Sequence, residues 1–242
     1  GYLIEVDAYA YSEDVWFSSN RGTPVTIKHP DEDDITGDQQ NFIANYFNKM
    51  EAAVFASNFT SETEGYRKYL DLDSFLKNFI VGEFAGNTDT YWSVYMYKDA
   101  ADGKLYTGPI WDYDLAFEND QRTYPINNLS DYIYASRGSV ASEAMRSLVT
   151  KIVKNDPAAK ARLLELWTAA RTEGGLDDLN EMVDELEVLL QESQELNFKR
   201  WKILDQRVHE NYQALGSYSA EVGTVRTYIT KRLESLDKLI RK

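Results

Sequence analysis

Two short polar motifs in this chain contain side chains that suit chemistry on a cation or a phosphate. The first is Gly-Asn-Thr-Asp at residues 86–89, and the second is Trp-Asp-Tyr-Asp at residues 111–114. Together they supply one amide and three carboxylates, the oxygen ligands that divalent cations such as Mg²⁺ prefer. The motifs therefore indicate a site for a metal ion or a nucleotide phosphate, provided that folding brings them together.

The segment between the motifs has the composition of a β-hairpin. Tyr91–Lys98 and Lys104–Trp111 are aromatic and β-branched enough to form strands, and residues 99–103 are typical of a turn. The two arms are equal in length, and such a hairpin returns the chain to its origin. We therefore expect the carboxylates of Asp89 and Asp112 to lie close together, because paired strands are only about 5 Å apart.

Phosphoryl transfer needs acidic side chains in two roles. One carboxylate orients or deprotonates the acceptor hydroxyl, and a second, with an amide, holds divalent cations against the nucleotide phosphates. Protein kinases place a helix, a polar loop, a short hairpin and a metal-binding Asp in that order, and this chain has the same order. The motif residues differ from those of common kinases. His-Arg-Asp and Asp-Phe-Gly are absent, and Asn87 precedes Asp89, whereas common kinases place the Asn after the Asp.

Two other interpretations of the same residues stay open. The polar residues of both motifs are also typical of turns and caps, which would give them no chemical role. Paired acids and an aromatic content of 13% also suit a carbohydrate-active protein, although glycosidase acids need neither a neighbouring Asn nor a metal. We expect the motif aromatics, Trp111, Tyr113 and Phe117, to be core residues.

The composition limits the partners and the metals. The chain has 242 residues, 43% of them hydrophobic, so it can bury a substantial core. Its 40 acidic and 26 basic residues give a net charge of -14, which argues against a nucleic-acid or anionic-membrane surface. With no Cys and only His29 and His209, a metal site has to be rich in oxygen, which favours Mg²⁺, Mn²⁺ or Ca²⁺ over zinc. No apolar run is long enough to span a membrane.

The flanking pattern predicts a small β segment followed mainly by helices. The first strands are expected at residues 2–6, 15–18 and 24–28. Thr36 and Gln39 form a capping-box pattern that begins one helix, and Asp73 is expected to cap a second helix that leads into Asn87. Glu83, on that second helix, is either a buried partner or a surface charge.

The second half of the chain is predicted to be helical after a long functional loop at residues 118–138. Asp156 with Pro157 predicts a helix start, and Gly174 with Gly175 predicts its end. Other helices are expected at residues 140–154, 176–204 and 220–242. The acidic stretch at residues 177–195 is interpreted as a solvated face.

Three segments resemble the spore coat protein H (CotH) kinase family. They are Gly-Tyr-Leu-Ile-Glu-Val-Asp at residues 1–7, the stretch at residues 69–99 that contains Asn-x-Asp and the tyrosine-rich strand, and Gly-Pro-Ile-Trp-Asp-Tyr-Asp within residues 108–117. The helical tail with Arg200-Trp201 is also similar. The resemblance covers most of the chain and is most specific in its central part.

The resemblance implies an α+β, atypical protein-kinase-like fold with a catalytic hairpin and a mainly helical C-terminal lobe. It also implies a bacterial transferase that moves phosphate from ATP, with Mg²⁺ or Mn²⁺, to serines of a protein substrate. Asp89 would take the catalytic-loop role with support from Asn87. Asp112 would bind the metal, with Asp114 as a second metal candidate. No residue is assigned to binding of the nucleotide itself.

The resemblance also implies an organisation within one kinase-like domain. We expect a β or linker segment at residues 1–35, a catalytic core at residues 36–138 and a helical subdomain at residues 139–242. In the family, the lobe that covers the nucleotide precedes the region where this chain begins, and the chain opens on Gly1 without an initiator Met or signal sequence. We therefore expect that lobe to be missing and ATP turnover by this chain to be weak or absent. Lys28 is not expected to replace the nucleotide-contacting Lys of the missing lobe.

The competing function is a degenerate kinase-fold scaffold that presents the loop at residues 118–138 to a partner without turnover. The retained polar motifs favour the enzyme slightly. An extracytoplasmic or cell-surface location is expected, with the targeting segment outside this chain. The substrate protein and the oligomeric state are not predicted by the sequence.

Overall fold

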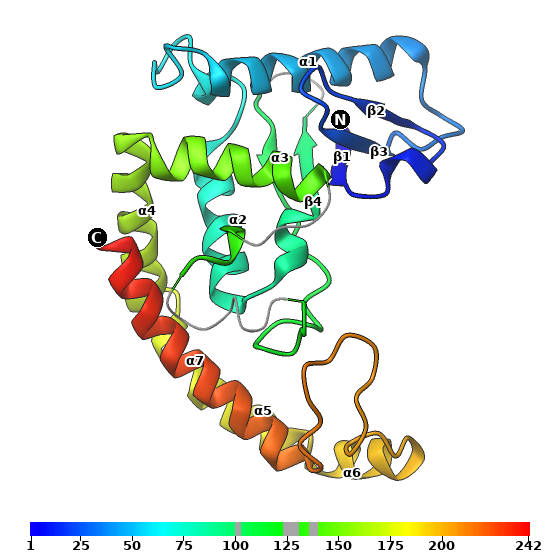
Figure 1. The fold of residues 1–242 in the computed structure, drawn as a ribbon, viewed down its shortest axis with the longest axis vertical. Helices are drawn as coiled ribbons and strands as arrows, with labels where there is room; N and C mark the ends of the chain where they lie inside the picture. The colour runs from blue at the N-terminus through cyan, green and yellow to red at the C-terminus, as the bar shows by residue number, and fades with distance from the viewer. Residues whose placement is uncertain (100–102, 123–130, 136–139) are drawn as a thin grey trace. The chain divides into compact units, whose positions relative to one another are not determined.

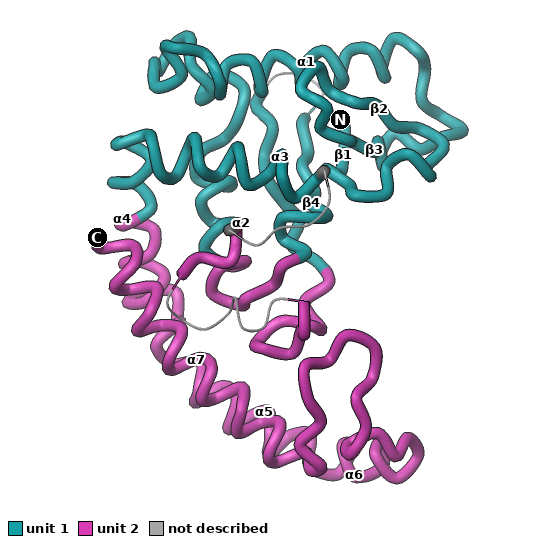
Figure 2. The backbone as a smooth tube through the Cα atoms, viewed as in Figure 1, with its two compact units in different colours: residues 1–80, 89–111, 137–163 teal, residues 81–88, 112–136, 164–242 magenta. Residues whose placement is uncertain are grey.

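The computed structural model describes residues 1–99, 103–122, 131–135 and 140–242 (Figure 1). The chain forms two compact units, each built from three segments (Figure 2). Unit 1 contains residues 1–80, 89–111 and 137–163, and unit 2 contains residues 81–88, 112–136 and 164–242. The described residues form an α+β fold, as the sequence predicts. The three sequence ranges 1–35, 36–138 and 139–242 stay a prediction.

Unit 1 contains a five-stranded antiparallel sheet in the order β2-β3-β1-β4-β5. Its central strand carries the fully buried Ile4, which pairs with Ile27 on one side and Met96 on the other. The three predicted N-terminal strands are therefore confirmed. The strands are β1 (Tyr2–Asp7), β2 (Trp16–Ser18), β3 (Pro24–His29), β4 (Ser93–Lys98) and β5 (Tyr106–Thr107).

Helix α1 (Gly37–Phe55) begins at the predicted capping box. The Gln39 N–H donates to Thr36 Oγ1 at 3.3 Å, and the Thr36 N–H donates to Gln39 Oε1 at 2.8 Å. The buried Phe47 lies edge-on to Phe17 of β2, with 5.9 Å between ring centroids. The local cap thus fixes where α1 starts, and its apolar face packs on the sheet.

Helix α2 (Leu72–Ala85) starts two residues before its predicted position. The Ser74 N–H donates to the side chain of Asp71 at 2.8 Å, so Asp71 caps the helix and the prediction for Asp73 is wrong. Asp73 instead accepts two hydrogen bonds from Arg162, at 2.8 and 2.7 Å. An ion pair between residues far apart in the sequence determines the role of Asp73.

The hairpin is shorter than predicted, and its arms are unequal. Strand β5 pairs with β4 only at Thr107 with Met96 and at Tyr106 with Tyr97. The chain then leaves the sheet at Gly108, whose φ is 132°, a value that glycine adopts readily. Pro109 has no N–H to continue the ladder. The predicted turn at residues 99–103 lies partly outside the described residues.

None of the three aromatic residues predicted to lie in the core is fully buried. Trp111 is exposed, and its ring lies edge-on to Tyr95 at 4.9 Å between centroids. Tyr113 and Phe117 are half-buried. The short second arm explains the exposure of Trp111, because the chain has left the ladder before it reaches this residue.

Two of the helices in the second half of the chain begin as predicted. Helix α3 (Val140–Val149) continues into a π-helical turn at Thr150–Lys154. The Ala158 N–H donates to Asp156 Oδ1 at 2.9 Å, which confirms Asp156 as the cap of helix α4 (Pro157–Thr172). The same carboxylate also accepts the Tyr66 hydroxyl at 2.7 Å and pairs with Arg67.

Unit 2 contains most of the C-terminal helices. The predicted helix at residues 176–204 is divided into α5 (Leu179–Leu189) and α6 (Gln191–Arg200), with a non-helical backbone at Leu190. Helix α7 (Tyr218–Ile240) starts at the Ser217 cap and contacts α5 (Figure 1). Among the described residues, no helix is both long and apolar enough to cross a membrane.

Candidate functional site

The end of α2 places Asn87. Gly86 has a φ of 70°, a left-handed conformation that commonly ends helices. The Gly86 and Asn87 N–H groups both donate to the Gly82 carbonyl, at 2.9 and 3.1 Å. The chain therefore leaves the helix abruptly at the first polar motif.

The structure joins the two polar motifs through one hydrogen bond within unit 2. Asn87 Nδ2 donates to the backbone carbonyl of Asp112 at 2.9 Å, and Asn87 is only 3% exposed. Asp112 has a φ of 60°, which is unusual for a non-glycine residue but tolerated best by Asn and Asp. Asp112 and Asp114 are both exposed. The structure thus brings Asn87 and Asp112 together and leaves both acidic residues of the second motif accessible.

Asp89 lies in a 3₁₀ turn at Thr88–Tyr91. It is half-buried, and its carbonyl accepts the Trp92 N–H at 3.0 Å. Asp89 belongs to unit 1, whereas Asn87, Asp112 and Asp114 belong to unit 2. Its proximity to the Asp112 carboxylate therefore stays a prediction.

A buried carboxylate that the sequence analysis missed supports the first motif. Asp120 is 2% exposed and accepts the Thr88 hydroxyl at 3.1 Å. It also pairs with Arg122 through Nε at 2.9 Å and Nη2 at 2.8 Å. The only local signal is the spacing of Asp120 and Arg122, which many exposed turns share. Asp120 thus holds Thr88 in place, and Thr88 lies between Asn87 and Asp89.

Glu83 is a buried partner, not a surface charge. It forms a fully buried ion pair with Arg232 of α7 at 3.0 Å. The Glu83 carboxylate also accepts the N–H groups of Ile133 and Tyr134, at 2.6 and 2.9 Å. These bonds satisfy the buried charge and tie the end of α2 to α7 and to the predicted functional loop.

The segment after the second motif is fixed against the same helix end. The Phe117 N–H donates to the Ala85 carbonyl at 2.7 Å, and the Phe117 ring lies edge-on to Phe84 and Tyr228, at 6.2 and 5.7 Å. Phe117 and Glu118 both have a positive φ, so strong tertiary contacts have to hold this turn. Burial raises the pKa of the Glu118 carboxyl above its ordinary value.

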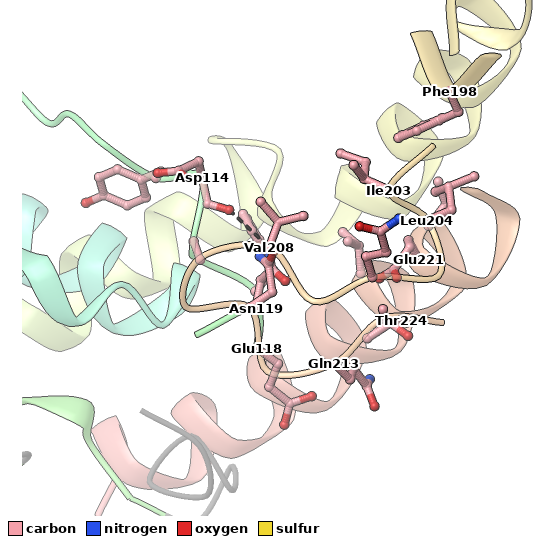
Figure 3. A pocket seen from close by; sticks show the side chains of 18 residues that line it. Asp114, Glu118, Asn119, Phe198, Ile203, Leu204, Val208, Gln213, Glu221 and Thr224 are labelled. Atoms are coloured by element: carbon pink, nitrogen blue, oxygen red, sulfur yellow. Dashed lines mark hydrogen bonds between the residues drawn. The ribbon is translucent and has the colours of Figure 1, made fainter. Parts of the chain in front are cut away.

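Asp114 lies at the edge of a pocket of 460 Å³ in unit 2 (Figure 3). The walls come from the segment after the second motif, from residues 203–214 and from α7. Three carboxylates line the pocket, those of Asp114, Glu118 and Glu221, and no Lys, Arg or His does so. An open, partly apolar pocket therefore lies beside one of the two predicted metal ligands.

The donor chemistry of the second motif fits a hard divalent cation. Asp112 and Asp114 offer carboxylate oxygens, which suit Mg²⁺ or Mn²⁺. No group of three or more His, Cys, Asp or Glu in the described part of the chain is arranged to hold a metal. Mg²⁺ commonly uses one or two carboxylates and takes its other ligands from phosphates and water, so the two residues are compatible with that mode of binding.

Lys28 has a structural role in unit 1. Its Nζ lies 3.3 Å from Glu5 and 3.3 Å from Glu13. Although burial opposes it, these carboxylates raise the pKa of Lys28 above its ordinary value. The expectation that Lys28 does not replace a nucleotide-contacting lysine stays a prediction.

The described residues form an α+β fold in which a helix, a polar loop, a hairpin and an acidic motif follow one another, the order that protein kinases also have. The family model described as CotH kinase protein matches residues 1–236, nearly the whole chain. The chain therefore belongs to the CotH kinase family. No curated protein and no solved structure matches it.

Proposed function

We propose that this chain carries the catalytic loop and the metal-binding acids of a protein kinase that transfers phosphate from ATP to serine. The observation that carries the proposal is the hydrogen bond from Asn87 to Asp112, since it joins a residue of the first motif to one of the second within unit 2. Membership of the CotH kinase family supports the same chemistry. A protein substrate and an extracytoplasmic or cell-surface location of this protein are part of the proposal.

Each motif has its own role in the proposed reaction. Asp89 accepts the proton of the serine hydroxyl as its oxygen attacks the γ-phosphorus and the bond to the β–γ bridging oxygen breaks, which releases ADP. Asn87 fixes the backbone at Asp112. Asp112 and Asp114 would hold a divalent cation, which would supply neutralisation of the negative charge of the phosphates.

Nucleotide binding is tested by thermal unfolding of this chain with Mn²⁺ and ATP. A ligand that binds only the folded state at 100 times its Kd stabilises it by about 2.7 kcal/mol. We expect a metal-dependent rise in Tm that is lost in Asp112→Asn. Asp205→Asn is the matched control, since Asp205 is an exposed Asp of the same unit outside the motifs. A rise that survives Asp112→Asn would remove Asp112 from the metal site.

Phosphate transfer is tested with radiolabelled ATP and the natural full-length protein. Asp89→Asn should keep the nucleotide-dependent rise in Tm and lower the transfer rate by about 10²- to 10⁴-fold, the usual contribution of a general base. Wild-type protein that binds the nucleotide without transferring phosphate would instead identify a degenerate kinase-fold binding module. Equal transfer by wild type and Asp89→Asn would exclude the role proposed for Asp89.

A further inference from the structure

Helix α5 has a row of exposed apolar side chains along one face. Met182, Leu186 and Leu189 follow one another by four and three residues, so they lie along one face of the helix, which we call the α5 stripe. Their exposed fractions are 54%, 44% and 74%. A stripe with this spacing normally packs on a core. Here no residue of α5 is buried.

The opposite face of α5 holds the helix to α7 through polar groups. Arg226 of α7 pairs with Asp184 at 2.6 Å and with Glu187 at 2.5 Å. Asn180 donates to the Thr230 hydroxyl at 3.0 Å. The helical period places these α5 residues on the side opposite the stripe. Polar contacts therefore join this face of α5 to α7, and the α5 stripe is left exposed on the other face.

The charge beside the stripe restricts what can cover it. Residues 172–198 contain no Lys or Arg. Four exposed glutamates without a described ion pair lie in this stretch: Glu181, Glu185, Glu192 and Glu195. Two copies of the surface would repel each other, and so would an anionic membrane. Electrostatic complementarity favours a partner with basic flanks.

We propose that the α5 stripe is a docking surface for an amphipathic helix of another protein. That helix carries apolar side chains at intervals of three and four residues, which interlock with Met182, Leu186 and Leu189. Lys or Arg residues flank its apolar side and face the glutamates of α5 and α6. This docking is separate from the phosphate-transfer proposal and can be tested on protein that transfers no phosphate.

Three labelled synthetic peptides of about three heptads each provide the probe. The first has Leu at the core positions and Lys on the flanks, the second has Glu on the flanks, and the third keeps Lys but has Ser in the core. Fluorescence anisotropy should show binding of the first peptide only, and added NaCl should weaken it. Equal binding of the second or the third peptide would overturn the proposal, because it would show attraction by apolar surface or by charge alone.

Two variants of the same helix test the face. Leu189→Asp should weaken binding of the first peptide at least tenfold, a loss of about 1.4 kcal/mol. Val188→Asp introduces the same charge at a side chain that is 75% exposed but lies off the stripe, so its affinity should change less than about twofold. Equal effects of both variants would overturn the proposal. A concentration-dependent dimer of the chain that Leu189→Asp abolishes would assign the stripe to a second copy and also overturn it.

Discussion

At the scale of single residues, backbone contacts organise the candidate site more than contacts between charged side chains do. Asn87 donates to a backbone carbonyl, and Glu83 accepts two backbone N–H groups. The carboxylate of Asp120 accepts a hydrogen bond from the Thr88 hydroxyl and so holds Thr88 in place. Such bonds hold the chain beside Asp112 and Asp114, which are both exposed.

The bond between Asn87 and Asp112 should contribute measurably to stability. Asn87→Asp replaces the donating amide by a carboxylate next to a carbonyl oxygen, so we expect a loss of about 1–3 kcal/mol in the free energy of unfolding in urea. Asn119→Asp is the matched control, since Asn119 donates to the Asp114 carbonyl at an exposed position. Its cost should stay within about 0.5 kcal/mol. Similar losses in both variants would show that burial of Asn87 adds nothing.

The ion pair of Asp73 with Arg162 should make stability depend on pH. Hydrogen bonds from Arg162 hold the pKa of Asp73 below its ordinary value of 3.8. Because the folded state then binds the proton less readily than the unfolded state, the stabilisation is present above pH 3.8 and is lost as the pH falls through the lower folded pKa. The stability difference between wild type and Asp73→Asn should shrink over that range.

Arg162→Gln provides the control for this pH dependence. Without the guanidinium, the pKa of Asp73 returns towards its ordinary value, so adding Asp73→Asn should leave the acid limb of the stability curve nearly unchanged. Urea unfolding at a series of pH values measures the effect of Asp73→Asn in wild type and in the Arg162→Gln variant. If Asp73→Asn changed the pH dependence of stability as much in the Arg162→Gln variant as in wild type, a group other than Arg162 would lower the pKa of Asp73.

At the scale of elements, local sequence patterns predicted where helices start better than they predicted which distant residues the side chains contact. The Thr36 capping box and the Asp156 cap are confirmed because each depends on a few neighbouring residues. Asp71 and Asp73 are both plausible caps by type, and only the distant Arg162 separates their roles. A capping rule contains no information on such a distant partner.

The hairpin and α5 show where periodicity misleads. The second arm has strand composition up to Trp111, but Gly108 and Pro109 end the ladder after two pairs. The leucines of α5 have the period of a core-facing helix, yet Leu186 and Leu189 are exposed and the helix contacts α7 through ion pairs with Arg226. Spacing predicted a helix here but not which face it buries.

The buried ion pair between α2 and α7 should dominate the coupling of these helices. Glu83→Gln leaves Arg232 charged and fully buried, so we expect a loss of about 3–5 kcal/mol in the free energy of unfolding. Amide exchange at Ile133 and Tyr134 should accelerate, since both N–H groups donate to the Glu83 carboxylate. Glu187→Gln, which breaks a more exposed pair with Arg226, should cost at most about 1 kcal/mol. Equal costs would show that burial does not set the strength of these pairs.

At the scale of the whole molecule, the pattern of strands and helices predicted the α+β class, and the resemblance of three segments indicated the family; both are confirmed. The division into compact units was not predictable from order along the chain. Each unit collects three separate segments, and the boundary falls inside α2 and inside α4. Long-range contacts define such units, and a search for linkers along a sequence does not detect them.

The net charge of -14 should make the whole fold sensitive to salt. Self-repulsion destabilises the compact state and is screened by ions. Raising NaCl from about 0.05 M to about 0.5 M should therefore raise Tm by roughly 2–4 °C, the shift expected from about 1 kcal/mol in a chain of this size. Thermal unfolding followed by circular dichroism measures the change.

A variant with lower charge separates this repulsion from other salt effects. Changing Glu181, Glu185, Glu192 and Glu195 to Gln removes four negative charges and takes the net charge from -14 to -10. These glutamates are exposed and have no described ion pair, so their replacement relieves repulsion without breaking a contact. The variant should have a higher Tm at low salt and a smaller salt-induced rise. A fall in wild-type Tm on adding salt would instead show that ion pairs such as those of Arg226 outweigh the repulsion.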